Sequence, residues 1–347
     1  MRFLVYGTGA VGGYLGARLA RAGHPVTFLA RPSAAEAIRR AGLRLEGGEQ
    51  AQVVTGCEVL TELPAAFALP TDGAVLLTVK AYDCEAAAEA LRRPGGGASP
   101  VVCLLNGIGN EETLSAAIGA ERVVPATLTT AVSAPAPGVV RIERERGLGL
   151  GRAPASERLA QAFREAGVPA RVYDDGASMK WSKVPTNIVA NASSAILGWT
   201  AGDVMRHAGL YRLEVEALRE VFRVMRRLGL RPVDLPGVPV RWMARGLALP
   251  AWATQRWLGG TVARGRGGKK PSFHFDIGRG RTEARWLNGA VVDAGRRVGV
   301  ATPANQMLLK TLLDLVESRD DPMAWRDRPE RLLRAAAEAG APGMRGA

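Results

Sequence analysis

The first twenty residues, MRFLVYGTGAVGGYLGARLA, constrain the fold of this chain more than any other stretch. A short apolar run of strand type, Arg2 to Tyr6, leads directly into Gly7-Thr8-Gly9-Ala10-Val11-Gly12, and a helical pattern follows at once. This order of strand, glycine turn and helix makes a common G-x-G-x-x-G match specific for a dinucleotide-binding fold. Gly7 permits the tight turn, Gly9 lets the backbone approach a pyrophosphate, and Gly12 allows close helix–strand packing. We therefore predict that Gly7 to Gly12 binds the phosphates of a dinucleotide.

The residue after the second predicted strand indicates which dinucleotide is bound. Val26 to Ala30 is apolar, and Arg31 follows it with no acid beside it. Sites for NAD place an acid there for the ribose 2′-hydroxyl, whereas an arginine accommodates a 2′-phosphate. We therefore expect NADPH, and the missing acid also argues against FAD and S-adenosylmethionine. A plain surface charge is the alternative role for Arg31.

Two unbroken apolar runs, Ala74 to Val79 and Val101 to Leu105, are typical of strands buried on both faces of a parallel sheet. Each is followed by a polar residue, Lys80 and Asn106, where a doubly wound sheet keeps its ligand crevice. We interpret both residues as cofactor or substrate contacts. Further strands are predicted at 123–130, 139–142, 148–150 and 170–173, and a helix at 156–167 with Ser156 as N-cap and Gly167 as C-terminal stop.

The second half of the chain carries helical patterns and few strand signals. In KWSKVPTNIVANASSAI, Lys183, Asn187 and Asn191 recur every four residues, which places them on one face of a helix. A solvated stripe in this chain would carry Arg and Glu, so we interpret this face as functional. Pro185 requires that the helix either begin near Ser182 or bend at the proline.

A second polar cluster lies between Ser272 and Thr302. Gly280-Arg281-Thr282-Glu283 predicts the start of a helix that runs to about Arg297. Thr302 and Pro303 then predict the start of the next helix, with threonine as N-cap and proline at the first helical position. His274-x-Asp276 has no visible third ligand, so we expect no metal site there.

Composition limits the class of protein. A length of 347 residues suggests two domains. The three cysteines are odd in number and lack C-x-x-C spacing, which argues against a disulfide framework or a zinc site. Neither a secretory signal nor a bilayer-spanning segment is visible, so we expect a cytoplasmic protein without a membrane partner.

The net charge of +13 is scattered along the chain, and only six of the 46 basic residues are lysine. We attribute this charge to an arginine-rich coding bias, not to nucleic-acid binding.

Several blocks of the chain, taken in order, resemble the ketopantoate reductase family: GTGAVGG, VKAY, LLNGIGN, W-x-K-x-x-x-N-x-x-x-N, GRTE with LNGAVV, and GVATPAN. They cover residues 1–235 and 271–310, and the lysine–asparagine stripe followed by GRTE is the most specific part. The resemblance implies an α/β fold, with an N-terminal doubly wound Rossmann sheet and a C-terminal all-helical domain, 6-phosphogluconate-dehydrogenase-like. It places the active site in the cleft between the domains, and implies NADPH-dependent reduction of 2-dehydropantoate to pantoate for pantothenate and coenzyme A synthesis.

The resemblance also assigns roles to single residues. Lys183 takes the position of the catalytic lysine, and Glu283 that of the glutamate that helps hold substrate and cofactor. Asn106, Asn187, Asn191 and Ser272 take substrate-contacting positions, and Lys80 and Asn106 lie on the cofactor side. The chemistry agrees, because reduction of a ketone leaves an alkoxide that needs a proton and electrostatic stabilisation, and a lysine supplies both.

The domains that we expect are an NADP-binding domain at 1–173, a helical substrate and dimerisation domain at 174–333, and a flexible tail at 334–347. The helical domain carries an insertion at 235–270 with three of the seven tryptophans. This insertion is interpreted as a lid or subunit contact, or equally as a surface excursion, and its basic, aromatic character leaves a membrane-surface role open.

Three departures from the family leave alternatives for the function. Ala201 stands about where a further substrate asparagine is expected, Ala284-Arg285 weakens an acidic pair, and the spacing from Asp276 to Glu283 is one residue short. One alternative is therefore a related reductase of another bulky 2-oxo acid. Another is a non-catalytic NADP sensor, which the presence of Lys183 argues against. The absence of any Tyr-x-x-x-Lys pair argues against short-chain dehydrogenase chemistry. A homodimer acting on a small 2-oxo acid is expected.

Overall fold

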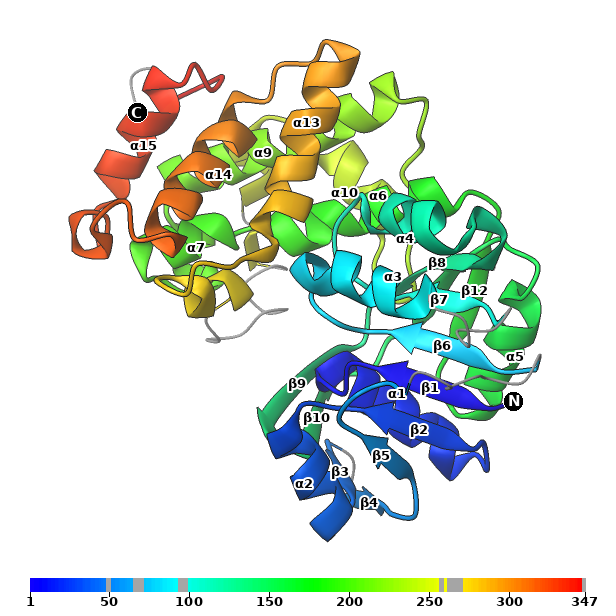
Figure 1. Ribbon diagram of the computed structural model, residues 1–347. Helices are drawn as coiled ribbons and strands as arrows, with labels where there is room; N and C mark the ends of the chain where they lie inside the picture. The colour runs from blue at the N-terminus through cyan, green and yellow to red at the C-terminus, as the bar shows by residue number, and fades with distance from the viewer. Residues whose placement is uncertain (48–50, 65–71, 93–98, 256–258, 261–270, 345–347) are drawn as a thin grey trace. The chain divides into compact units, whose positions relative to one another are not determined.

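The computed structural model describes residues 1–47, 51–64, 72–92, 99–255, 259–260 and 271–344. The chain divides into two compact units (Figure 1). The first comprises Met1–Lys180 with Leu235–Val238, and the second comprises Trp181–Asp234 with the described residues from Pro239 onward. The division falls within helix α6, Gly176–Ile188, a few residues after the position expected from the sequence.

In the described residues, the first unit is built on an eight-stranded sheet with the order β12-β11-β8-β7-β6-β1-β2-β5. Its strands are β1 (Phe3–Tyr6), β2 (Val26–Leu29), β5 (Glu58–Leu60), β6 (Ala74–Leu77), β7 (Val101–Cys103), β8 (Val123–Leu128), β11 (Leu148–Gly151) and β12 (Ala170–Tyr173). Neighbouring strands are parallel except β8 and β11. The strand order reverses between β1 and β6, where a doubly wound sheet binds its ligand. The predicted Rossmann architecture is confirmed.

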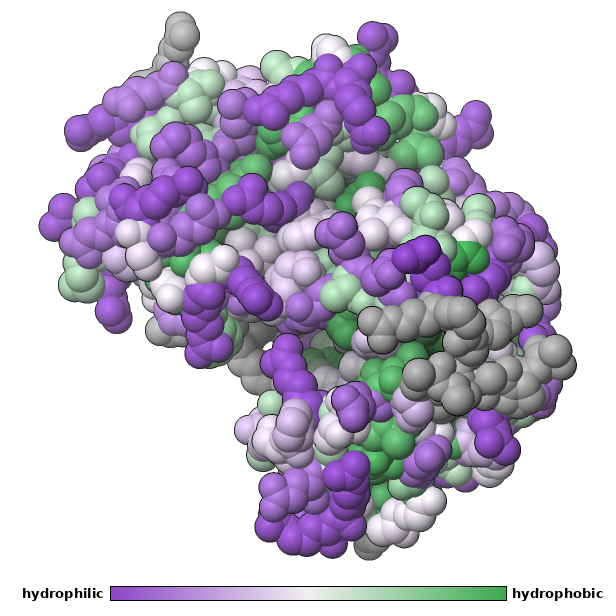
Figure 2. All heavy atoms as spheres, in the orientation of Figure 1, coloured by the Kyte–Doolittle hydropathy of each residue, from purple (hydrophilic) through white to green (hydrophobic). Residues whose placement is uncertain are grey.

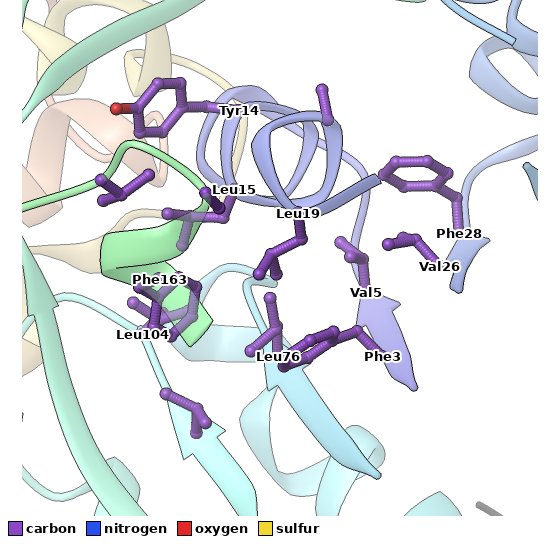
Figure 3. Packing of buried hydrophobic residues seen from close by; sticks show 14 of the residues in the cluster. Phe3, Val5, Tyr14, Leu15, Leu19, Val26, Phe28, Leu76, Leu104 and Phe163 are labelled. Atoms are coloured by element: carbon purple, nitrogen blue, oxygen red, sulfur yellow. The ribbon is translucent and has the colours of Figure 1, made fainter. Parts of the chain in front are cut away.

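Helices cover both faces of this sheet: α1 (Ala10–Arg21), α2 (Pro32–Ala41), α3 (Cys84–Arg92), α4 (Asn110–Ile118) and α5 (Ser156–Glu165). Phe3 and Val5 belong to one buried cluster with α1 and α5, whereas Leu4 belongs to another with α3 and α4. Figure 3 shows Leu15 and Leu19 of α1 in the cluster that contains Phe3 and Val5 of β1. Successive strand residues point to opposite faces, so burial on both sides explains the unbroken apolar runs.

A smaller sheet packs against α1, with the order β4-β3-β10-β9. Its strands are β3 (Leu43–Glu46), β4 (Gln52–Val54), β9 (Ala131–Ala136) and β10 (Val139–Arg144). Leu43, Leu45 and Val140 join the same core as α1. Of its four strands only β10 was predicted from the sequence. Gly138, at a φ of 73°, turns β9 into β10.

In the described residues, the second unit is helical, as predicted. Its α-helices are α6, α7 (Ala192–Leu197), α8 (Ala201–Arg206), α9 (Ala208–Arg227), α10 (Val240–Gly246), α11 (Ala251–Thr254), α13 (Asn288–Val298), α14 (Pro303–Val316) and α15 (Pro329–Glu338). The long helix α9 contacts α8, α11, α13, α14 and α15. Hydrophilic side chains predominate over α13, α14 and α15 on the face that Figure 2 shows, while Leu312 and Leu332 are buried beneath. The unit is therefore organised around α9. No helix of the described chain has the length and apolarity that crossing a membrane requires.

The first turns of α5 and α14 differ from the predictions in their capping. Ser156 is the first residue of α5 and not its N-cap; its hydroxyl accepts from Ala153 N–H (3.0 Å) and donates to the Gly151 carbonyl (2.6 Å). The serine thus secures the preceding turn. Gly167, at a φ of 74°, ends the helix as predicted. Thr302 precedes α14 as predicted, yet its side chain makes no capping hydrogen bond.

The continuous helix predicted from Gly280 to Arg297 is wrong. Glu283–Trp286 forms a short 3-10 turn, η5, and α13 begins only at Asn288. Leu287 between them has φ and ψ angles of −108° and −90°, which are not helical. Thr282 begins this turn, because its hydroxyl accepts the Ala284 N–H at 3.2 Å. The threonine cap therefore favours a tight turn that does not continue into α13.

The flexible tail expected at 334–347 is not what residues 334–344 form, and residues 345–347 lie outside the described residues. Helix α15 continues past Leu333 to Glu338, and Ala336, Ala341 and Met344 are buried. Small apolar side chains in this segment pack onto the helical core, since α15 contacts α9 and α14. Of the insertion at 235–270, residues 256–258 and 261–270 lie outside the described residues. The remainder includes α10 and α11, where Trp242 and Trp252 are 62% and 82% exposed.

Candidate functional site

The glycine turn after β1 has the geometry that a dinucleotide phosphate requires. Gly7 has a φ of 103°, and a Cβ there would lie 2.9 Å from Val79 Cγ1. A Cβ on Gly12 would lie 2.3 Å from the Gly7 carbonyl oxygen and 2.5 Å from Thr78 Oγ1. In contrast, no heavy atom lies within 4 Å of a Cβ on Gly9. The first and third glycines are therefore required by packing, and the second leaves space for a ligand at the N-terminus of α1.

Hydrogen bonds hold this turn against its neighbouring strands. Thr8 Oγ1 donates to the Leu29 carbonyl at the end of β2 (3.1 Å), and Thr78 Oγ1 donates to the Gly7 carbonyl (2.6 Å). Ala10 and Val11 begin α1, where the first N–H groups of a helix have no intrahelical acceptor. The predicted residues Gly7 to Gly12 thus present backbone donors in a fixed position.

Arg31 and Lys80 follow the two strands that flank β1. Arg31 is at the N-cap of α2 with a side chain 83% exposed, and Lys80 is exposed at the end of the β6 segment. The Arg31 guanidinium lies 3.9 Å from the Asp83 carboxylate, an acid that sequence analysis did not consider. An exposed ion pair at this distance contributes little free energy and is screened by solvent. The pair therefore leaves Arg31 able to bind a phosphate.

A pocket of about 220 Å³ opens beside the glycine turn. It is lined by Thr8, Gly9, Ala34, Leu43 and residues 134–140 of the β9–β10 hairpin. The backbone of the turn forms one wall and the hairpin forms another. The pocket therefore extends the phosphate site along the sheet that packs against α1.

Asn106 lies where the sequence predicted, just beyond β7, and is exposed. Its carbonyl accepts a hydrogen bond from Asn110 Nδ2 at 3.0 Å. Gly107 and Gly109 have φ angles of 88° and 102°, so the loop turns sharply before α4 begins. The asparagine is thereby fixed at the carboxyl end of the sheet.

A buried ion pair, which sequence analysis missed, supports this loop. Lys180 is 5% exposed, and its Nζ donates to the carbonyls of Leu105 (2.7 Å) and Ala126 (3.2 Å) and lies 2.8 Å from Glu111 Oε1. Burial is the largest single influence and lowers the pKa of Lys180, but the charge and hydrogen bond of Glu111, with Cys103 and Glu112, together raise that pKa above the ordinary value. The only sequence signal was a lysine among apolar residues, three positions before Lys183.

The lysine–asparagine stripe is divided between two helices of the second half. Helix α6 begins at Gly176, not near Ser182, and continues through Pro185 to Ile188. Lys183 and Asn187 are half-buried on it, one turn apart. Asn191 lies beyond the end of α6, at the N-cap of α7.

Asn191 connects three of the predicted substrate residues. Its Nδ2 donates to the Asn187 carbonyl (3.1 Å) and to Ser272 Oγ (3.3 Å), and its Oδ1 accepts the Phe273 N–H (3.3 Å). Asn191 is 5% exposed, whereas Ser272 is exposed at the start of the 3-10 turn η4, Ser272–Asp276. Residues far apart in the sequence therefore form one polar cluster.

Glu283 and Ala201 are two further positions that the family resemblance singles out. Glu283 is 5% exposed in η5, which contacts α13 and α14. Ala201 is buried at the first position of α8, so its side chain offers no hydrogen bond where the family has an asparagine. No group of three His, Cys, Asp or Glu side chains suited to a metal ion occurs in the described part of the chain.

A doubly wound sheet with a glycine phosphate turn, followed along the chain by a helical unit that holds a lysine and an amide cluster, is the architecture of an NAD(P)-dependent oxidoreductase. Residues 3–155 match the family model described as Ketopantoate reductase PanE/ApbA, and residues 176–315 match its C-terminal model. The chain belongs to the ketopantoate reductase family, which confirms the resemblance seen in the sequence.

Individual relatives agree over most of the chain. The 2-dehydropantoate 2-reductase of Archaeoglobus fulgidus is 30% identical over 323 residues, which cover 91% of this chain and 96% of that protein. A solved PanE/ApbA family ketopantoate reductase from Ralstonia eutropha JMP134 superposes with a TM-score of 0.77 at 30% identity, over 92% of this chain and 99% of the other. D-mandelate dehydrogenase, solved with NADH and anilino(oxo)acetate, gives a TM-score of 0.75 at 19% identity over 92% and 99% of the two chains, which shows a shared fold alone.

Proposed function

We propose that this protein reduces 2-dehydropantoate to pantoate with NADPH, in the cytoplasm, as a step of pantothenate and coenzyme A synthesis. The observation that carries the proposal is the cluster of Asn187, Asn191 and Ser272, of which Asn187 lies one helical turn after Lys183 on α6. Amide and hydroxyl groups next to an ammonium group suit a small hydroxylated oxo acid. Membership in the family and the name of the Archaeoglobus fulgidus relative support this choice.

The residues of the first unit fit NADP(H). Gly7, Thr8, Gly9, Ala10, Val11 and Gly12 would hold the pyrophosphate, because a Cβ on Gly9 meets no atom while those on Gly7 and Gly12 would clash. Arg31 would hold the 2′-phosphate, and Lys80 and Asn106 would contact the cofactor farther along the strand ends. When bound, NADPH supplies the hydride that reduces the ketone.

The remaining chemistry is assigned to side chains of this chain. Lys183 donates a proton to the alkoxide that forms on reduction, and its charge stabilises that oxyanion. Asn106, Asn187, Asn191 and Ser272 orient the oxo acid by hydrogen bonds, which lowers the entropic part of the barrier. Glu283 helps to hold substrate and cofactor. Asn191 is already fixed by three hydrogen bonds, so it needs little reordering on binding.

We also propose the division of labour between the two parts of the chain. Residues 1–173 would bind NADP(H), and residues 174–333 would bind the oxo acid and form a homodimer. The Rossmann-like sheet in the first part and the cluster of Asn187, Asn191 and Ser272 in the second support this assignment.

The test is the loss of NADPH absorbance with purified protein and a panel of 2-oxo acids. We expect kcat/KM for 2-dehydropantoate to exceed that for any other member by about tenfold or more, because a polar site discriminates strongly against substrates that leave its groups unpaired. Higher activity with a bulkier 2-oxo acid would favour a second candidate, a related reductase of that acid, which is suggested by Ala201 at about the position of an expected substrate asparagine. Tight NADPH binding without any turnover would favour a sensor and contradict the enzyme.

Cofactor choice gives a separate prediction. Arg31→Ala is expected to raise KM for NADPH by about 10–100-fold, the value of a hydrogen bond to a charged group, and to change KM for NADH less than about twofold. Arg40, an exposed arginine in the last turn of α2, is the matched control, and Arg40→Ala is expected to leave both values unchanged. An equal loss with both cofactors would show that Arg31 does not read the 2′-phosphate.

A further inference from the structure

A buried carboxylate from α9 occupies the break between α6 and α7. Glu214 is 2% exposed, and its Oε2 accepts the Ala190 N–H at 2.6 Å. Its Oε1 accepts the hydroxyl of Ser193, in the first turn of α7. One oxygen of the side chain thus binds a residue between the two helices, and the other binds the first turn of α7.

The carboxylate takes the place of a backbone acceptor. In a continuous helix the Ala190 N–H would donate to the carbonyl of Thr186, four residues earlier. Ala190 instead has a φ of 51°, a left-handed conformation that is unfavourable for an alanine, and it is fully buried. The other non-glycine residues with positive φ in the described chain, Ser318 and Asp327, are exposed. A buried N–H turned out of its helix needs an acceptor, and Glu214 supplies it.

The break determines where Asn191 points. In a continuous helix, the Asn191 N–H would occupy the Asn187 carbonyl. Here that N–H donates to the Ile188 carbonyl (2.9 Å), which leaves the Asn187 carbonyl to the Asn191 side chain (3.1 Å). The same side chain then reaches Ser272 and the Phe273 N–H. The cluster proposed to bind the oxo acid therefore depends on the left-handed residue next to it.

We propose that Glu214 is a positioning residue for substrate binding: it holds the α6–α7 break and thereby fixes Asn191 and Ser272. The inference rests on the proposed function, because it assigns the binding of the oxo acid to this cluster. Glu214 acts through Ala190 and Ser193. Its effect is therefore expected on the affinity for the oxo acid and not on the affinity for NADPH.

The test compares two buried carboxylates of the same helix. Glu214→Ala is expected to raise KM for the oxo acid by about 10–100-fold, a usual result of displacing binding groups by about 1 Å, with KM for NADPH within about twofold of the parent. Glu216 is 4% exposed and pairs with Arg219 and Arg223 of α9 itself. Glu216→Ala therefore removes a comparable buried charge without touching the break, and KM for the oxo acid is expected to stay within about twofold.

A conservative variant separates positioning from a general loss of structure. Glu214→Gln keeps an oxygen for the Ala190 N–H and an NH₂ group that can donate to Ser193, so KM for the oxo acid is expected within about threefold of the parent. A parent-like KM in Glu214→Ala, or an equal rise in Glu216→Ala, would overturn the proposal.

Amide hydrogen exchange provides a readout that does not need turnover. The peptide that covers residues 188–194 is expected to exchange at least about tenfold faster in Glu214→Ala, and at the parent rate in Glu216→Ala. If no 2-oxo acid is reduced, the proposed function fails, while faster exchange in Glu214→Ala alone would still support the role of Glu214 in the break. Unchanged exchange in Glu214→Ala would refute that role even in an active enzyme.

Discussion

A Lys183→Ala variant is expected to lower kcat for reduction of the oxo acid by about 10²–10⁴-fold, the usual contribution of a positioned general acid. Lys183 is half-buried on α6, one turn before Asn187, so Lys183 and this member of the amide cluster come from adjoining turns of one helix. Removing the ammonium removes both the proton and the charge that stabilises the oxyanion. Steady-state kinetics at saturating NADPH would measure the change.

Two further measurements decide whether the lost group is the acid. Lys183→Arg keeps the positive charge but donates its proton poorly, because the pKa of a guanidinium lies far above that of a lysine ammonium group. Its kcat is therefore expected between those of the parent and Lys183→Ala. NADPH binding, followed by fluorescence titration, is expected to be unchanged in both variants. A Lys183→Ala enzyme that keeps more than about a tenth of the parent kcat would rule out a general acid at this position.

The glycine turn shows what could be predicted from the sequence. Gly7 and Gly12 are fixed by contacts with Val79 and Thr78 at the end of β6, and the turn itself follows from local backbone rules. The apolar runs that became β6 and β7 were equally clear, because burial on both faces removes polar residues from a strand. The positions of Lys80 and Asn106 could be predicted because each residue follows the carboxyl end of one of these two strands. These features depend on short stretches of chain, so the sequence alone indicated them.

The helix break at Ala190 could not be predicted in this way. The segment contains neither glycine nor a turn signal, and the four-residue spacing to Asn191 continues the helical pattern. Its cause is Glu214, 24 residues later in the chain. The start of α14 is similar: the predicted Thr302 side chain makes no cap, and Glu220 of α9 accepts the N–H groups of Ala304 and Asn305 instead (2.8 and 2.9 Å). In both cases a distant carboxylate decides a local structure.

The roles of the amide residues came from the family resemblance, and their proximity came from the structure. Nothing in the spacing of Asn191 and Ser272, 81 residues apart, indicated a hydrogen bond between them. Their contact depends on η4 packing against α7. The family motif thus marks the residues, while tertiary packing brings them together.

Lys180→Met is expected to destabilise the first unit by about 3–5 kcal/mol, the usual cost of removing one partner of a buried ion pair. The methionine fills the same space but leaves Glu111 and the carbonyls of Leu105 and Ala126 without the Lys180 donor. Lys310, 79% exposed beside Asp314 on α14, is the matched control. Lys310→Met is expected to cost about 0–1 kcal/mol, because exposed pairs are screened. Urea denaturation followed by circular dichroism would measure both.

The pH dependence of the unfolding free energy tests whether the charge of Lys180 causes the loss of stability expected in Lys180→Met. Its pKa in the folded protein is raised above the ordinary 10.5, so its stabilising contribution is complete below pH 10.5. That contribution declines as the pH rises through the folded pKa, since the folded state then loses a proton that it held more tightly than the unfolded chain. The difference in unfolding free energy between the parent and Lys180→Met is therefore expected to narrow in alkaline buffer.

A double variant, Lys180→Met with Glu111→Gln, is expected to be more stable than Lys180→Met alone, because it removes the unpaired charge of Glu111. A difference that is constant with pH, together with no gain in the double variant, would assign the loss to packing and not to the ion pair.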